Sequence, residues 1–245
     1  MTAGLDAPRE AELAASLRSV TARLDAACRS ADRSPESVQL IAVTKGFPAS
    51  DIAILAALGV RDIGENRDQE ARAKIAQLQT QFAGQPKAAV VVWHFVGQLQ
   101  TNKCRSVARY ADVVHSVDRA SLVAALSEAA ARAGRRLDVF AQVSLDDRPG
   151  RGGAPVDTVP ALADLVATAS ALRLVGVMAI APLGGDPDAA FARLHEVSAQ
   201  LQADHPAAAG ISAGMSDDLE AAIRHGATHV RIGTALLGRR PTTLG

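Results

Sequence analysis

The feature that most constrains the fold of this chain is a regular alternation between short β-branched runs and longer stretches rich in Ala and Leu. The short runs predict strands at Val38–Val43, Arg61–Ile63, Val90–Phe95, Asp112–Ser116, Leu137–Val143, Leu172–Met178, Ala208–Ile211 and Thr228–Ile232. The stretches between them predict helices at about residues 49–58, 65–80, 98–109, 118–134, 155–170, 187–203 and 216–225, and a short one from Thr234. Such alternation implies parallel strands joined by helical crossovers.

Eight such units predict a single (β/α)₈ barrel, because eight parallel strands can close and leave no sheet edge. A doubly wound open sheet shows the same alternation and is the alternative. Residues 8–32 precede the first unit and predict an additional amphipathic helix. The sequence shows no linker or change of composition, so we expect one domain over residues 1–245, with the barrel at 38–240.

The charge balance and the cysteine content restrict which partners and which cellular compartment we expect for this chain. The 26 basic residues equal the 26 acidic ones, which gives no support for a nucleic-acid or anionic-membrane partner. The two cysteines, Cys28 and Cys104, predict neither a disulfide framework nor a zinc site. The N-terminus has no apolar signal core, and no apolar run is long enough to span a bilayer. We therefore expect a cytoplasmic protein.

Lys45 is the first candidate for chemistry, since side chains just after strand C-termini face the active site of a parallel barrel. It has the parity of Val43, so an inward Val43 would place Lys45 at the mouth. A lysine in such a setting has a lowered pKa and can attack carbonyl groups. Taken alone, the position is better explained by a surface lysine at a strand end.

A second candidate site lies in the C-terminal third, where small polar residues follow two strands. Ser212 follows the seventh strand, and Gly233 and Thr234 lead from the eighth strand into a short helix. Backbone N–H groups at such a helix start bind phosphate, and barrels commonly hold phosphate after strands seven and eight. Arg231 should project inward near the mouth, as a ligand contact or a member of a buried ion pair.

Other strand ends carry weaker signals. Asn66 either contacts a ligand or caps the following helix, and His94 faces inward as a ligand contact or a structural hydrogen-bonding residue. Met178 lies on one side of its strand with Gly176, where it borders a planar ligand or belongs to the core. The glycine-rich loop at Gly150–Gly153 is a lid or a connector.

Taken together, the residues at the strand ends indicate which chemical groups a ligand of this site would carry. In a closed barrel the first and eighth strands are neighbours, so the Lys45 amine lies beside the expected phosphate site. A ligand with both a carbonyl and a phosphate fits this pair, and pyridoxal 5′-phosphate (PLP) is such a ligand. The scattered histidines form no metal-binding pair that competes with this interpretation.

Five segments resemble a known family, in order and with suitable spacing over residues 38–240: IAVTKGFP, IGENRDQE, WHFVGQLQTNK, VGVMAIAP and GMSDDLEAAIRHGATHVRIGTALLG. They resemble the PLP homeostasis proteins, also called the YggS/PROSC family, whose fold is similar to the N-terminal barrel of alanine racemase (fold-type III). The resemblance implies a Schiff base on Lys45, phosphate contacts from Ser212, Gly233 and Thr234, and Arg231 at the pyridine nitrogen. It places Asn66, His94 and Met178 around the cofactor.

The sequence departs from the family at Arg67, where many members have Tyr, at Ala213, where Met is common, and in its GRGG loop. The resemblance implies vitamin B6 homeostasis without turnover: a monomer or weak dimer that buffers PLP and supplies apo-enzymes. Only 14 residues follow Arg231 (245 − 231), so we expect no C-terminal β-domain of the racemase kind. The alternatives are a PLP enzyme on amino acids, such as a racemase, and a barrel whose lysine forms Schiff bases with sugars. The sole tyrosine, Tyr110, is expected away from the mouth, which disfavours a racemase.

Overall fold

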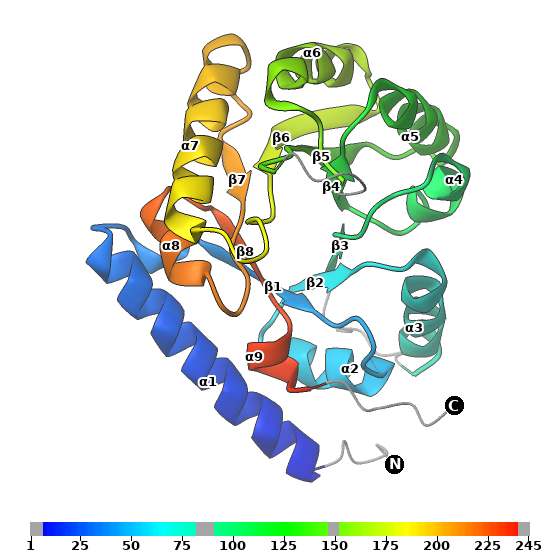
Figure 1. Cartoon of the computed structure of the whole chain (residues 1–245). Coiled ribbons are helices and arrows are strands. Elements are labelled where there is room, and N and C mark those ends of the chain that lie inside the picture. Colours follow the sequence, from blue (N-terminus) through cyan, green and yellow to red (C-terminus); the bar gives the residue numbers. More distant parts are fainter. Residues whose placement is uncertain (1–6, 82–90, 147–151, 240–245) are drawn as a thin grey trace.

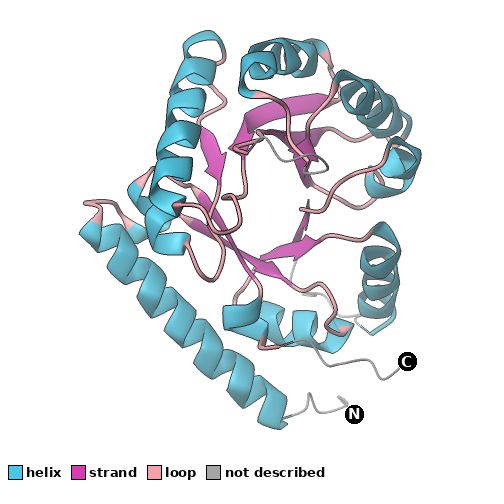
Figure 2. Ribbon diagram, in the orientation of Figure 1, coloured by secondary structure: helices cyan, strands magenta, loops and turns pink. Residues whose placement is uncertain are grey.

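A closed barrel of eight parallel strands forms the centre of the molecule in the computed structural model, which describes residues 7–81, 91–146 and 152–239 (Figures 1 and 2). The strands are β1 (Gln39–Val43), β2 (Asp62–Glu65), β3 (Val92–Phe95), β4 (Val113–Val117), β5 (Leu137–Gln142), β6 (Leu172–Met178), β7 (Gly210–Ser212) and β8 (His229–Ile232). They follow one another in sequence order, and β1 closes the ring by pairing with β8. The barrel prediction is confirmed, and the open sheet is excluded.

Helices surround this ring, as Figure 2 shows in cyan. They are α1 (Ala7–Ser30), α2 (Ala49–Ala57), α3 (Asp68–Gln81), α4 (Cys104–Val107), α5 (Ala120–Arg132), α6 (Val159–Thr168), α7 (Pro187–Asp204), α8 (Leu219–Arg224) and α9 (Thr234–Leu237). The predicted helix at 98–109 is instead a 3₁₀ turn at Thr101–Lys103 followed by the short α4. Glu65, expected to start a helix, is the last residue of β2, and its buried side chain takes part in the hydrogen bonds described below.

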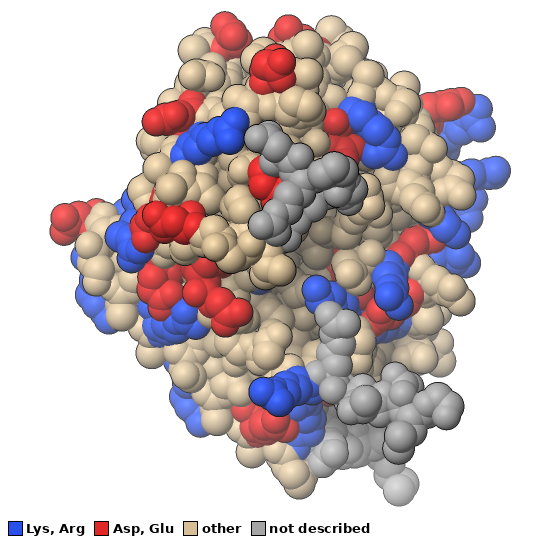
Figure 3. Space-filling view, viewed as in Figure 1, with Lys and Arg blue, Asp and Glu red and all other residues tan. Residues whose placement is uncertain are grey.

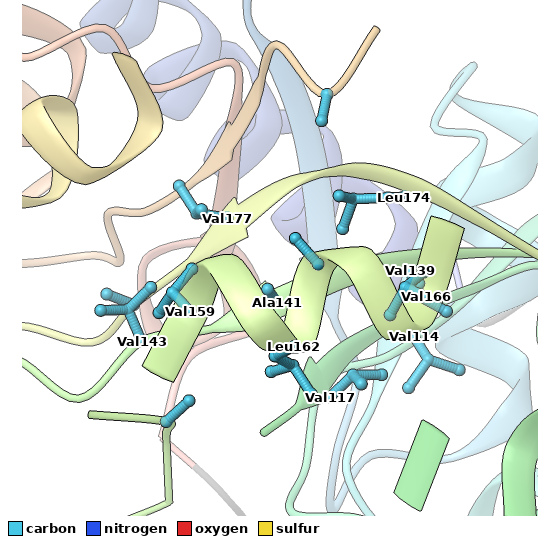
Figure 4. Packing of buried hydrophobic residues seen from close by; sticks show 14 of the residues in the cluster. Val114, Val117, Val139, Ala141, Val143, Val159, Leu162, Val166, Leu174 and Val177 are labelled. Atoms are coloured by element: carbon cyan, nitrogen blue, oxygen red, sulfur yellow. The ribbon is translucent and has the colours of Figure 1, made fainter. Parts of the chain in front are cut away.

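The largest apolar core lies between the outer faces of the strands and the helices. Around α6 it is formed by side chains of β4, β5, α6 and β6 (Figure 4). Val159, Leu162 and Val166 recur at helical spacing on α6, and they pack against β-branched residues such as Val139 and Val177 of β5 and β6. Each such buried side chain contributes about 1.5–3 kcal/mol, so the strand–helix contacts stabilise the barrel wall.

The predicted N-terminal helix forms as α1 and lies along the outside of the barrel beside α8, α9 and α2 (Figure 1). Its buried face carries Leu13, Val20, Leu24 and Cys28. Two arginines attach it to the end of the chain. Arg9 binds the Asp51 carboxylate and donates to the carbonyl of Leu237, 3.0 Å away. Arg23 pairs with Glu220 and donates to the carbonyl of Ser216 at 2.6 Å.

Two glycines permit a close approach of β6 and β7. Gly176 pairs with Gly210, and its φ of +155° lies in a region that side chains disfavour. A Cβ atom at Gly176 would lie 1.8 Å from the carbonyl oxygen of Gly210. Any side chain at this position would therefore force the two strands apart.

We expect Gly176→Ala to lower the free energy of unfolding by about 3 kcal/mol, because the clash is with backbone and cannot relax by a rotamer change. Urea denaturation of the two proteins measures the difference. Gly59→Ala is the control, since Gly59 also has a positive φ but a Cβ atom there would have nothing within 4 Å. That control should lose only about 1 kcal/mol. Equal losses would show that the strand contact is not decisive.

Candidate functional site

Lys45 lies in a tight turn immediately after β1, at the C-terminal end of the barrel. The amide of Phe47 donates to the carbonyl of Thr44 at 3.0 Å, which closes a four-residue turn. Gly46 has a φ of +80° whereas Lys45 does not have a positive φ, the combination of a type II turn with glycine at its third position. The Lys45 side chain is half-buried. The turn thus places Lys45 at the C-terminal end of the barrel.

A group of charged side chains from α3 and β2 lies behind this turn. The ammonium of Lys74 donates to the Thr44 carbonyl at 2.7 Å, to Glu65 Oε1 at 2.6 Å and to Glu70 Oε1 at 2.6 Å. Glu70 Oε1 also accepts the backbone N–H of Gly46. Burial raises the pKa of Glu65 in spite of the neighbouring ammonium. No local pattern predicts this group, because Lys74 stands among charged residues on a surface helix.

The second half of the predicted site lies next to the first. Ala42 of β1 pairs with Ile232 of β8, and a Cβ at Gly233 would lie 3.4 Å from the carbonyl oxygen of Val43. Thr234, which starts α9, is exposed. The segment after β1 that carries Lys45 and the Gly233–Thr234 turn are therefore adjacent, as a closed barrel requires.

Ser216 connects the two loops that follow β7 and β8. Its hydroxyl accepts the N–H of Ala235 in α9 at 3.1 Å. The carboxylate of Asp218 accepts the N–H of Met215 at 2.6 Å. The first contact holds the loop after β7 close to the start of α9, and the second closes that loop on itself, so the two strand ends form one surface.

Arg231 points into the barrel, as its parity predicted, and is 5% exposed. Its guanidinium donates to Ser212 Oγ at 2.7 Å and to the carbonyl of Ala179 at 3.0 Å. Both acceptors are neutral, and within the described part of the chain Arg231 makes no ion pair. Burial lowers the pKa of Arg231 to about 10, and the more distant Asp218 raises it only in part. A buried cation with neutral partners favours an anion or a bare lone pair as its ligand.

A chain of hydrogen bonds extends from Ser212 through the interior of the barrel. His115 Nδ1 lies 2.9 Å from Ser212 Oγ, and His115 Nε2 lies 2.9 Å from His94 Nδ1. His94 Nε2 lies 2.9 Å from a carboxylate oxygen of Asp62 at the start of β2. The chain therefore connects the N-terminal end of the barrel with Arg231 near the mouth. Neither His115 nor Asp62 was a predicted site residue.

The chemistry of these groups fixes the direction of the hydrogen bonds at the two ends of the chain. Although burial opposes it, hydrogen bonds from His94 and Gln39 hold the pKa of Asp62 below its ordinary value, so Asp62 accepts from His94. At the other end Ser212 Oγ accepts from the guanidinium of Arg231, which offers only donors.

Packed rings fill the same part of the barrel. The His115 ring stacks on Phe140 at 4.6 Å between centroids, and His229 meets Phe140 edge-on at 5.1 Å. Met178, 1% exposed, belongs to the small interior cluster with Phe140 and Val113. Burial lowers the pKa of His115 well below its ordinary value, and burial with the charge of His94 lowers the pKa of His229 to about 4. Both rings are therefore neutral at physiological pH.

This arrangement predicts a loss of stability in mild acid. The unfolded chain binds a proton at His229 near pH 6.5, whereas the folded chain binds it only near pH 4. The free energy of unfolding should therefore fall as pH is lowered from about 6.5 to about 4, by up to about 3 kcal/mol from His229. Urea denaturation across this range measures the slope, which His229→Phe should reduce. His205→Gln, on the outer surface, should leave the slope unchanged, and an unaltered slope in His229→Phe would refute the assignment.

The remaining predicted residues divide between the mouth and the interior. Asn66 follows β2, is half-buried, and packs closely against the next loop, since a Cβ at Gly97 would lie 2.2 Å from the Asn66 carbonyl oxygen. His94 is a member of the interior hydrogen-bond chain. Of the loop at Gly150–Gly153, residues 150 and 151 lie outside the described residues. Gly153 donates its N–H to Asp118 at 3.3 Å.

Several alternative kinds of site find no support in the described residues. They contain no group of three or more His, Cys, Asp or Glu that could hold a metal ion, and Cys28 and Cys104 are buried thiols. Tyr110 lines the groove between α3 and α4, outside the barrel. No helix within the described ranges is long and apolar enough to cross a membrane. Acidic and basic side chains are interspersed on the face shown in Figure 3.

Comparison with known proteins identifies relatives that span nearly the whole chain. The family described as alanine racemase, N-terminal domain, matches residues 16–241. The pyridoxal phosphate homeostasis protein of Mycobacterium tuberculosis (strain H37Rv) is 46% identical over 244 residues, which cover 95% of this chain and 94% of that protein. PipY of Synechococcus elongatus, whose structure was solved with PLP bound, is 35% identical and covers 92% of this chain and 100% of its own, with a TM-score of 0.77.

Alanine racemase from Corynebacterium glutamicum shares the barrel alone. Its TM-score is 0.66 at 14% identity, over 94% of this chain and 62% of that enzyme. At this identity the likeness concerns the fold and carries no argument about the reaction.

Proposed function

Because this chain belongs to the alanine racemase N-terminal domain family, and within it to the pyridoxal phosphate homeostasis proteins, we propose that it binds PLP at the C-terminal mouth of its barrel. The observation that carries the proposal is the adjacency of three features: the half-buried Lys45, the Gly233–Thr234 turn and the buried cation of Arg231. They suit the aldehyde, the phosphate and the ring nitrogen of one ligand. PLP supplies an aldehyde that condenses with a lysine amine and releases water.

Lys45 is the residue proposed to attach PLP covalently. Its turn places Lys45 at the mouth, and a lysine amine is the side-chain group that condenses with an aldehyde. The Gly233–Thr234 turn is proposed to bind the phosphate through backbone N–H groups, together with Ser212. A phosphate contact from Ser212 requires its hydroxyl proton to point toward the mouth, which rotation about one single bond allows.

The other proposed contacts surround the ring. Arg231 is proposed to donate to the pyridine nitrogen, because a guanidinium offers only donors and therefore suits a bare lone pair. Asn66 at the mouth is proposed as a direct neighbour of the cofactor. His94 and Met178 lie deeper in the barrel, and we propose that they support the floor of the site.

We propose that the protein holds and supplies PLP and does not turn over amino acids. The relatives' name, pyridoxal phosphate homeostasis protein, supports a role in cofactor supply. The position of the chain's only tyrosine agrees, since Tyr110 lies in the outer groove and offers no tyrosine acid at the mouth. Chiral chromatography after incubation with L-alanine tests this point. Turnover of roughly one per second or more would overturn it.

The compartment and the partners follow from this role. We propose that the whole chain is one domain and acts in the cytoplasm, where PLP-dependent apo-enzymes would be its recipients. A monomer or weak dimer suits a protein that must release its ligand to many partners. Sedimentation of the PLP-loaded protein alone tests the oligomeric state. Sedimentation with an apo-aminotransferase tests whether such an enzyme is a recipient.

The phosphate contact predicts a strong preference for PLP over pyridoxal. Pyridoxal has the same aldehyde and ring but lacks the phosphate, so it should bind roughly 100-fold more weakly, equivalent to about 2.7 kcal/mol. Titration followed by absorbance gives both affinities. Thr234→Ala, which keeps the backbone N–H groups, should change the ratio little. Equal affinities for the two ligands would show that the turn does not bind the phosphate.

A further inference from the structure

The turn that carries Lys45 is fixed from both sides by one pair of side chains on α3. Lys74 binds the carbonyl of the residue before Lys45, and Glu70 binds the amide of the residue after it. Lys74 and Glu70 are themselves paired, 2.6 Å apart at i and i+4 on α3. Helix and turn therefore form a closed set of contacts around the backbone of Lys45, although neither side chain faces the proposed ligand site in these contacts.

The pair of Lys74 and Glu70 is held in one rigid arrangement and does more than neutralise charge. Lys74 is 5% exposed, and its ammonium makes three hydrogen bonds, which uses all three of its donors. The third acceptor, Glu65, is fully buried and also accepts from the Thr44 hydroxyl at 2.5 Å. A buried ammonium with every donor engaged has a single favourable position, so the Thr44 carbonyl is held in one orientation.

We propose that Lys74 and Glu70 are positioning residues that set the location of the Lys45 amine relative to the phosphate turn. The proposal rests on the covalent role proposed for Lys45. Attack on an aldehyde requires the amine to approach within bonding reach in one direction, and small displacements of a reacting group reduce reactivity steeply. A type II turn without its α3 contacts would let Lys45 sample other directions, while the phosphate turn on β8 and α9 would be unaffected.

A purely structural role would predict a different pattern, and two ligands separate the two cases. PLP can bond to Lys45, whereas pyridoxine 5′-phosphate has the same ring and phosphate but an alcohol in place of the aldehyde. If the α3 pair positions Lys45, its loss should weaken PLP binding and leave pyridoxine 5′-phosphate binding intact. If the pair only maintains the fold, its loss should weaken both ligands alike.

Four variants and one control test the proposal. Lys74→Met removes the ammonium at nearly constant volume. Lys74→Met/Glu65→Gln also removes a buried carboxylate and guards against unfolding caused by unpaired charge. Glu70→Ala removes the acceptor for the Gly46 amide, whereas Glu70→Gln keeps an oxygen there and should restore binding. Arg132→Met is the control, since it breaks the exposed i and i+4 pair with Glu128 on α5. Thermal melting identifies a temperature at which all variants are folded.

The measured quantities are the two affinities and the rate at which borohydride-stable label appears on the Lys45 peptide. We expect PLP affinity and labelling rate to fall about tenfold to a hundredfold in both Lys74 variants and in Glu70→Ala. The affinity for pyridoxine 5′-phosphate should stay within about twofold of the wild-type value, because the noncovalent contacts with its ring and phosphate are unchanged. Parallel losses for both ligands, or wild-type labelling in the folded double variant, would overturn the proposal. Absence of label on Lys45 in the wild type would instead refute the proposed function itself.

Discussion

Replacing Lys45 by alanine should abolish covalent attachment of PLP. With wild-type protein, borohydride should fix a pyridoxyl group on the peptide that contains Lys45, and mass spectrometry should locate it there. The variant should yield no such peptide and should bind PLP about 100-fold more weakly, because only the phosphate and ring contacts remain. The effect is the largest we expect, since no other described lysine follows a barrel strand directly.

Lys103 provides the matched control. It is an exposed lysine in the 3₁₀ turn after β3, on the same end of the barrel. Lys103→Ala should leave the labelled peptide and the affinity unchanged. Label on Lys103 or Lys74 in the wild type would show that the attachment site has been assigned to the wrong residue.

Replacing Arg231 by methionine should lower the affinity for PLP and leave the stability of the ligand-free protein nearly unchanged. Removing a buried guanidinium relieves its desolvation, but it leaves the Ala179 carbonyl and Ser212 without a donor. These effects oppose one another, so the free energy of unfolding without ligand should stay within about 1 kcal/mol of wild type. PLP affinity should fall about 100-fold, because a charge-assisted hydrogen bond to the ring is lost.

The protonation state of the bound ring gives a second measurement. The charge of Arg231 should keep the pyridine nitrogen of PLP unprotonated, since a protonated ring beside it would form a like-charge pair. Nitrogen NMR with ring-labelled PLP reports this state directly. A protonated ring at neutral pH in wild type, unchanged in Arg231→Met, would contradict the role of Arg231. Arg173→Met, at an exposed pair with Asp138, should alter neither measurement.

The architecture could be predicted because its determinants are local. Most strands carry β-branched residues whose outward side chains pack on a helix, and the eight repeated units predicted the closed barrel, while an open sheet shows the same alternation. Boundaries were less accurate where tertiary contacts override the local pattern. Glu65 reads as the start of a helix, yet its hydrogen bonds to Thr44 and Lys74 hold it at the end of β2. The stretch at 98–109 reads as one helix and instead forms a 3₁₀ turn followed by the short α4.

The candidate site could be predicted only in part, for a related reason. Residues at strand ends, such as Lys45 and Arg231, are found by their place in the repeat. Lys74 and Asp62 act through partners distant in sequence, and neither has a local pattern that distinguishes it from a surface charge. His115 did carry a usable signal: a histidine in the apolar strand VVHSV must face either the core or the barrel interior.

The attachment of α1 to the opposite end of the chain has a consequence for synthesis. Ribosomes produce Arg9 and Arg23 long before Ser216 and Leu237, the residues whose carbonyls they bind. Strand β1, with its lysine, likewise waits for β8. A nascent chain therefore exposes the apolar face of α1 and one unpaired edge of β1 until the last unit leaves the ribosome. Pausing late in translation would prolong this exposure, so the newly made chain needs chaperone protection most during synthesis of its final quarter.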